Sequence, residues 1–161
     1  MEVVFLSLGS NLGNREKNLK KAVKLLKKNM QVEKVSGVYL TEPVGSIKQA
    51  DFFNIAVKAR TVLDPFQLLD VCKSIEKKLK RQRTVKWGPR TIDVDILLFG
   101  MEKIKTAGLT VPHKELAKRR FVLLPLKEIS PGIKHPVLGK TVKRLLKLTK
   151  DKKTAIRIGK L

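Results

Sequence analysis

The stretch that decides the fold of this chain is Trp87-Gly88-Pro89-Arg90-Thr91-Ile92-Asp93-Val94-Asp95-Ile96-Leu97-Leu98-Phe99-Gly100. Apolar residues alternate with Asp93 and Asp95, and this period of two predicts a β-strand over residues 92–99. Successive side chains of a strand point to opposite faces, so both carboxylates are expected on one face of a sheet.

Two neighbouring carboxylates on a rigid strand suit a Mg²⁺ ion. Mg²⁺ binds through one or two carboxylates and leaves its other positions to water and phosphate oxygens. A bare Asp-x-Asp pattern on a strand is common and says little by itself. Here Arg90 and Trp87 precede it, and a guanidinium beside an aromatic ring suits an anionic or planar ligand. The stretch therefore predicts a metal and anion site.

Hydrophobic periodicity on either side of this strand predicts an α+β domain. Strands are expected over 3–8, 32–41 and 53–60, a helix after the capping residue Asn14, and a second helix from Asp64-Pro65 to about Lys80. With the strand over 92–99, the order is β-α-β-β-α-β, which is ferredoxin-like: a four-stranded antiparallel sheet with both helices on one face. Long loops are expected over 42–51 and 81–91. Smaller additions follow, namely helices over 121–129 and 142–148 and a strand over 155–158.

Composition limits the classes of protein. The 161 residues are 42% hydrophobic, which suits a single domain over 1–161, and they include no apolar run long enough to span a membrane. Cys72 is the only cysteine, so no internal disulfide can form, and we expect a cytoplasmic protein. Its place on an apolar helical stripe predicts a buried core residue.

The net charge of +22 favours polyanionic ligands such as nucleotides or nucleic acid, although a lysine-rich solvated surface gives the same total. Basic residues between Lys73 and Arg90 precede the metal strand, where a triphosphate needs them. The basic stretch from Lys134 to Leu161 is remote from every motif and is interpreted as surface.

A second candidate site lies on the predicted strand over 53–60. Phe52 and Asn54 are two residues apart and face away from the apolar set that includes Phe53 and Ile55. A ring and an amide on one face provide stacking and a donor–acceptor pair for a flat heterocycle.

Four ordered segments resemble the 6-hydroxymethyl-7,8-dihydropterin pyrophosphokinase family of the folate pathway. They are residues 5–14, residues 39–45 followed by 51–54, the stretch 87–100, and Leu109-Thr110-Val111-Pro112-His113 followed by Arg119 and Phe121. The resemblance extends to about Pro131. It implies the ferredoxin-like fold and transfer of a pyrophosphoryl group from ATP to the hydroxymethyl oxygen of the pterin, giving AMP.

The resemblance also implies roles for individual residues. Asp93 and Asp95 hold two Mg²⁺ ions. The expected catalytic residues are Arg81, Arg83, Arg90, Asp93 and Asp95. The expected ATP-binding residues are Arg83, Lys86, Trp87, Arg90, Ile96, Thr110, His113 and Arg119, with Arg120 as the alternative phosphate ligand to Arg119. The expected pterin-binding residues are Thr41, Glu42, Pro43, Val44, Phe52, Asn54, Trp87, Asp93 and Phe121.

An RNA-binding module is the competing hypothesis, because RNA-recognition motifs share the ferredoxin-like order. Two features argue against this hypothesis. Aromatic residues, which such modules use to stack on bases, make up only 5% of the chain, and Asp93 and Asp95 would repel an RNA phosphate backbone in the absence of a metal ion. We therefore expect small-molecule substrates, ATP and the pterin, with no membrane, no specific nucleic acid and a monomeric enzyme.

Overall fold

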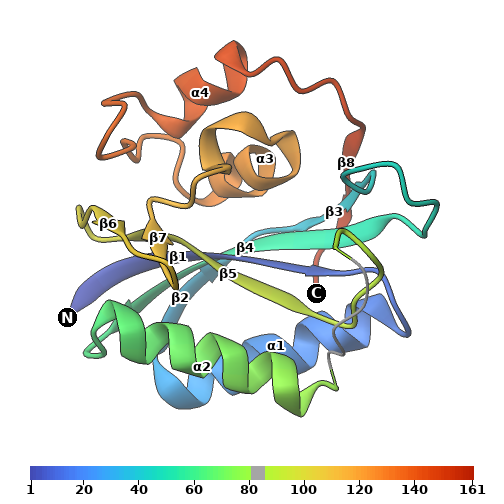
Figure 1. Ribbon diagram of the computed structural model, residues 1–161, viewed down its shortest axis with the longest axis horizontal. Coiled ribbons are helices and arrows are strands. Elements are labelled where there is room, and N and C mark those ends of the chain that lie inside the picture. Colours follow the sequence, from blue (N-terminus) through green and yellow to red (C-terminus); the bar gives the residue numbers. More distant parts are fainter. Residues whose placement is uncertain (81–85) are drawn as a thin grey trace.

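The computed structural model describes residues 1–80 and 86–161, and its centre is an antiparallel β-sheet (Figure 1). Within the described residues the strand order is β5-β1-β4-β3-β8, and β2 also pairs with β4. The strands are β1 (Glu2–Ser10), β2 (Gln31–Val35), β3 (Val38–Thr41), β4 (Phe52–Thr61), β5 (Asp93–Phe99) and β8 (Ala155–Gly159). The positions of β5, β1, β4 and β2/β3 confirm the ferredoxin-like order expected from the sequence.

Two amphipathic helices cover one face of this sheet, α1 (Arg15–Asn29) and α2 (Pro65–Lys78) (Figure 1). The Asn14 side chain accepts a hydrogen bond from the backbone of Lys17, and Asp64 forms a capping box with Gln67. Both caps confirm the predicted helix starts, while α2 ends at Lys78 rather than Lys80. The apolar stripes are buried against the sheet: Leu19, Ala22, Val23 and Leu26 from α1, and Leu68, Cys72 and Ile75 from α2. Burial raises the pKa of the Cys72 thiol to about 12.

The opposite face carries a 3₁₀ turn, η1 (Leu116–Lys118), and two helices, α3 (Arg120–Ile129) and α4 (Val142–Leu148) (Figure 1). Leu123 and Leu126 of α3 are buried with Phe5 and Leu98 of the sheet. The helix expected over 121–129 is confirmed, one residue longer and with Pro125 buried inside it. RNA-recognition motifs bind RNA on an uncovered sheet face. Because helices lie on this face, the RNA-binding hypothesis loses support.

The single strand expected over 32–41 is wrong, because the chain breaks into β2 and β3 at Ser36-Gly37. The Ser36 backbone N–H donates to the Ala56 carbonyl, and the Ser36 hydroxyl accepts from the Ala56 N–H at 2.8 Å. The Gly37 N–H turns away and donates to Glu128 at 2.6 Å. A side-chain oxygen thus replaces a ladder bond, and the pairing with β4 resumes in β3, where Tyr39 lies opposite Asn54.

The sheet is also larger than the four strands expected, since the predicted C-terminal strand joins its edge as β8, antiparallel to β3. A short hairpin of β6 (Ile104–Lys105) and β7 (Thr110–Val111) was not anticipated. Of the loop expected over 81–91, residues 81–85 lie outside the described residues. In the part of the chain that is described, none of the helices combines the length and apolar character that crossing a bilayer requires.

Candidate active site

A pocket lies at one edge of the sheet, where β1 and β3 end and β4 and β5 begin. The antiparallel register brings these ends together, because Gly9 pairs with both Asn54 and Asp93, and Thr41 pairs with Phe52. The start of α3 closes the pocket. The residues that line the pocket are Gly9, Thr41, Glu42, Val44, Phe52, Asn54, Trp87, Arg90, Asp93, Asp95, Leu97, His113, Arg119, Phe121 and Val122.

The structure gathers most of the residues singled out from the sequence. Every expected pterin-binding residue lines this pocket except Pro43. Among the expected ATP-binding residues, Ile96 and Thr110 line an adjoining groove, which Asp95 and His113 share with the pocket. Lys86 stands outside both, with its Nζ 5.4 Å from the centre of the Trp87 ring. Arg81 and Arg83 lie outside the described residues.

Asp93 and Asp95 occupy alternate positions at the start of β5 and both line the pocket, as the period of two predicts. Arg90 Nη1 lies 3.0 Å from Asp93 Oδ2, and the two side chains are only 18% and 24% exposed. Among the described residues, no group of three or more histidine, cysteine or acidic side chains could hold a metal. Two carboxylates are nevertheless enough for Mg²⁺, which takes its other ligands from water and phosphate. The pair therefore fits the ion that the sequence predicts.

Asn54 and Phe52 form a wall of the pocket from β4. Asn54 is buried, and its Nδ2 donates to Thr41 Oγ1 at 2.6 Å. A Cβ on Gly9 would overlap Asn54 Oδ1, so glycine is required for the amide to pack there. The Phe52 ring lies beside the pocket, 5.6 Å from the Arg90 guanidinium carbon. This arrangement offers an aromatic surface next to a fixed amide.

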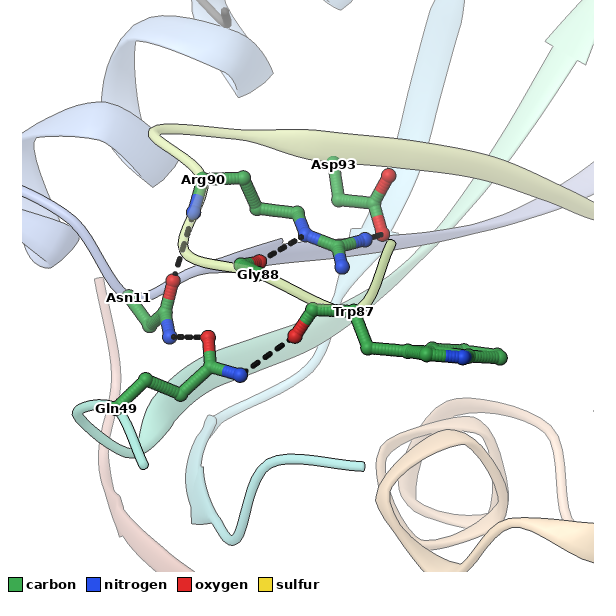
Figure 2. A network of polar contacts seen from close by, with 6 residues as sticks. All are labelled: Asn11, Gln49, Trp87, Gly88, Arg90 and Asp93. Carbon is green, nitrogen blue, oxygen red and sulfur yellow. Dashed lines mark hydrogen bonds and ion pairs between the residues drawn. The ribbon is translucent and has the colours of Figure 1, made fainter. Parts of the chain in front are cut away.

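The turn that carries Trp87 and Arg90 is tied to two other segments (Figure 2). The Arg90 N–H donates to Asn11 Oδ1 at 2.9 Å, and Asn11 Nδ2 donates to Gln49 Oε1 at 2.8 Å. Gln49 Nε2 in turn donates to the Trp87 carbonyl at 2.6 Å. Trp87 has a φ of 65°, a left-handed conformation that costs energy for a non-glycine residue. Asn11 and Gln49 therefore hold a strained turn, and with it the indole, at the pocket.

Arg119 and Arg120 have different environments. The Arg119 guanidinium carbon lies 5.2 Å from the centre of the Trp87 ring and 5.6 Å from that of Phe121, facing the pocket. Arg120 is not among the lining residues, and its backbone N–H donates to Asp151 at 2.9 Å. Of the two alternatives left open by the sequence, the geometry favours Arg119.

His113 is held as a neutral hydrogen-bond donor. Its backbone N–H donates to the Leu97 carbonyl, and its Nδ1 accepts from the Glu115 N–H at 3.1 Å. That bond places the remaining ring proton on Nε2. Burial, together with the charge of Arg119, lowers the pKa of His113 below its ordinary 6.5. At neutral pH the imidazole thus offers an N–H without a charge.

Residues 5–131 match the family model described as 7,8-dihydro-6-hydroxymethylpterin-pyrophosphokinase (HPPK). The chain belongs to this family. It is 50% identical over 129 residues to a 2-amino-4-hydroxy-6-hydroxymethyldihydropteridine pyrophosphokinase of Bacillus subtilis, covering 79% of this chain and 77% of that one. It is 44% identical over 143 residues to the Aquifex aeolicus protein of that name, covering 89% of both.

Some HPPK relatives are longer than this chain. A bifunctional protein FolKE of Lactococcus lactis is 47% identical over 131 residues, but these are 80% of this chain and only 38% of that protein. Among solved structures, Plasmodium falciparum HPPK-DHPS superposes with a TM-score of 0.74 at 19% identity, covering 91% of this chain and 45% of that one. This last likeness supports the fold alone.

Sequence reasoning gave no role to several residues that build this HPPK pocket. Gly9 and Asn11 fall in a segment that carried the family resemblance, but nothing in the sequence revealed which side chains they meet. Gln49 carries no sequence signal, because its partners lie 38 residues away on either side. Leu97 follows Asp93 and Asp95 on the same strand face, but an apolar residue there carries no sign of a role. Val122 is indistinguishable from a core residue in the sequence.

Proposed function

We propose that this HPPK chain transfers the pyrophosphoryl group of ATP to the hydroxymethyl oxygen of 6-hydroxymethyl-7,8-dihydropterin in folate biosynthesis, giving AMP and the pterin diphosphate. This is the reaction of the family, and two relatives that the chain covers over 77% and 89% of their length carry that enzyme's name. The observation that carries the proposal is the meeting of the β5 carboxylates with the aromatic and amide wall of β4 in one pocket.

The wall of β4 and the start of α3 are proposed to bind the pterin. Phe52 and Phe121 offer ring faces for stacking, and Asn54 offers an amide for the edge of the heterocycle. The Asn54–Thr41 hydrogen bond fixes the rotamer of that amide before the substrate arrives. Val44 and Trp87 line the same pocket and exclude water from the bound ring.

The β5 edge and its basic neighbours are proposed to bind the triphosphate. Asp93 and Asp95 would hold Mg²⁺, two ions in the family resemblance. When bound, this metal neutralises phosphate charge and makes the attacking hydroxyl more acidic. Arg90, Arg119 and the His113 Nε2–H supply donors to the phosphate oxygens, and Ile96 and Thr110 line the adjoining groove for the nucleoside.

The chemistry forms one bond and breaks one. The hydroxymethyl oxygen of the pterin attacks the β-phosphorus of ATP, and the bond from that phosphorus to the oxygen bridging to the α-phosphorus breaks. AMP leaves with that oxygen, and the hydroxyl proton goes to solvent. Positioning and electrostatic stabilisation account for most of the catalysis of such transfers, so no covalent enzyme intermediate is required.

The test is AMP formation from ATP and Mg²⁺, measured with and without 6-hydroxymethyl-7,8-dihydropterin. Pterin-dependent AMP is the expected result. Formation of ADP would contradict the proposal, because it indicates transfer of a single phosphoryl group. ATP binding without turnover would also contradict it and would favour a binding role.

We propose in addition that the active form is a cytoplasmic monomer with a single domain over 1–161. The single cysteine suits a reducing compartment, and the length of the chain suits a single domain. Light scattering of the eluting active fraction is expected to give the monomer mass. Titration calorimetry with Mg²⁺ and a non-hydrolysable ATP analogue is expected to show two ions per chain.

A further inference from the structure

Besides the β4 wall, the proposed pterin pocket has two further walls, and the segment of residues 149–155 links them. It lies beyond residues 5–131, which match the family model, and runs from α4 to the edge strand β8 (Figure 1). One wall of the pocket is the turn after β3, which begins at Glu42. The other wall is the start of α3, where Arg119 and Phe121 flank Arg120.

The first attachment is to Glu42. The Glu42 N–H donates to the Thr154 carbonyl at 3.1 Å, and the Thr154 N–H donates to Glu42 Oε1 at 2.8 Å. The hydrogen bond from Thr154 lowers the pKa of the Glu42 carboxyl, so it stays ionised at neutral pH. The carboxylate of Glu42 is thus engaged with residues 149–155, although the residue lines the pocket.

The second attachment is to α3. Asp151 Oδ2 accepts from the Arg120 N–H at 2.9 Å, and Asp151 Oδ1 accepts from the Lys153 N–H at 2.9 Å. The N-cap residue Arg119 makes no side-chain capping bond, so Asp151 supplies an acceptor to the first turn from outside the helix. Its negative charge is also favourable at the positive end of the helix dipole.

The two attachments are three residues apart, on a segment that is fixed at both ends. At its first residue, the Thr149 hydroxyl donates to the Lys118 carbonyl at 3.1 Å. At its last residue, Ala155 pairs with Thr41 as β8 begins. A short segment fixed in this way acts as a spacer between Glu42 and the start of α3.

We propose that residues 149–155 set the separation of the two walls of the pterin pocket, with Glu42 and Asp151 as positioning residues for the pterin. The inference rests on the pterin function proposed above. The rest of β8 has an anchor of its own, because Glu128 of α3 accepts hydrogen bonds from Tyr39 and Arg157, each at 2.8 Å. Removing Glu42 or Asp151 therefore leaves the strand attached.

The test compares Asp151→Ala, Glu42→Ala and the double variant with the wild type. Asp70→Ala is the matched control, because Asp70 is an exposed acid on α2 and its loss changes the charge equally. Calorimetry gives the Kd of an ATP analogue with Mg²⁺, then the Kd of 6-hydroxymethyl-7,8-dihydropterin in its presence. Each single variant is expected to weaken pterin binding about tenfold, as for loss of a hydrogen bond to a charged group. ATP-analogue binding stays within about twofold.

Non-additivity distinguishes a shared spacer from two separate contacts. Glu42→Ala removes the carboxylate bond to Thr154 and keeps the backbone bond, and Asp151→Ala removes the attachment of the same segment to α3. Because both changes loosen one shared link, the double variant is expected to lose much less than the product of the two single losses. Asp151→Asn keeps an acceptor for the Arg120 N–H and is expected to restore most of the affinity. Unchanged pterin binding, equal losses for both ligands, or fully multiplicative losses would each overturn the proposal. Absence of pterin-dependent AMP from the wild type would instead reject the proposed function.

Discussion

The β4 wall of the pocket and the turn that carries Trp87 and Arg90 are held in different ways. Asn54 is buried in the sheet and bonded to Thr41 of the neighbouring strand. Arg90 and Trp87 instead stand on a turn whose position depends on side-chain hydrogen bonds from Asn11 and Gln49 (Figure 2). A flat heterocycle needs fixed partners, whereas a triphosphate can be held by long cationic side chains that adapt. The difference predicts that strand substitutions act more strongly than turn substitutions.

The largest effect is expected at the metal strand. Asp95→Ala removes a carboxylate that is proposed to hold Mg²⁺, and kcat is expected to fall about a thousandfold or more, as for loss of a major electrostatic element. Steady-state AMP formation at saturating ATP, Mg²⁺ and pterin measures it. Asp70→Ala, which removes an exposed acid from α2, is expected to keep the wild-type rate. A near-normal rate for Asp95→Ala would remove this residue from the metal site.

A smaller but selective effect is expected for the pterin wall. Asn54→Ala removes the amide, and kcat/KM for the pterin is expected to fall about a hundredfold, since pterin donors and acceptors lose their partner. Binding of an ATP analogue stays unchanged. Thr41→Val removes only the hydroxyl that fixes the amide, and a loss of about tenfold is expected. If Asn54→Ala weakened both substrates alike, the wall would not be specific to the pterin.

The strands were more predictable from the sequence than the turn for a physical reason. Alternation along a strand fixes the face of a side chain locally, so the shared face of Asp93 and Asp95 followed from a period of two. Asn11 and Gln49 meet only after the whole sheet has formed, and no local pattern encodes that meeting. The break at Ser36 likewise depends on a bond to Ala56, twenty residues further along the chain.

Helix starts were also predictable, because Asn14 and Asp64 cap their helices through bonds only two or three residues long. The attachment of β8 to the sheet was not predictable, although a strand was expected over 155–158. Its hydrogen-bonding partner, β3, lies more than 100 residues earlier in the chain. Periodicity predicts that a strand exists but not which strand it pairs with.

The turn itself is expected to be moderately sensitive. Gln49→Ala breaks the link between Asn11 and the Trp87 carbonyl, so the strained turn populates other conformations, and kcat/KM is expected to fall about tenfold. Steady-state rates with each substrate varied in turn measure the loss. Gln31→Ala, at an exposed position that begins β2, is the matched control and is expected to behave as wild type. A loss as large as that of Asn54→Ala would break the distinction between strand and turn.

The smallest effect is expected at His113. His113→Asn keeps an acceptor for the Glu115 N–H but loses the Nε2–H donor, and KM for ATP is expected to rise about fivefold with KM for the pterin unchanged. Because its pKa is lowered below 6.5, the imidazole is already neutral at pH 7. The ratio of wild-type to variant KM is therefore expected to be constant between pH 7 and 8. A ratio that fell toward pH 7 would mean that the charged imidazolium binds the phosphates.

His113 and His135, the two histidines of the chain, also predict how stability depends on pH. Burial lowers the pKa of both, so the unfolded chain binds more protons than the folded one below pH 6.5. This contribution is fully present above that pH and is lost as the pH falls through the folded pKa values. His135→Asn is expected to reduce the loss of Tm between pH 7 and 5.5 without changing KM for ATP, whereas His113→Asn changes both. The two substitutions thus separate proton linkage from phosphate binding.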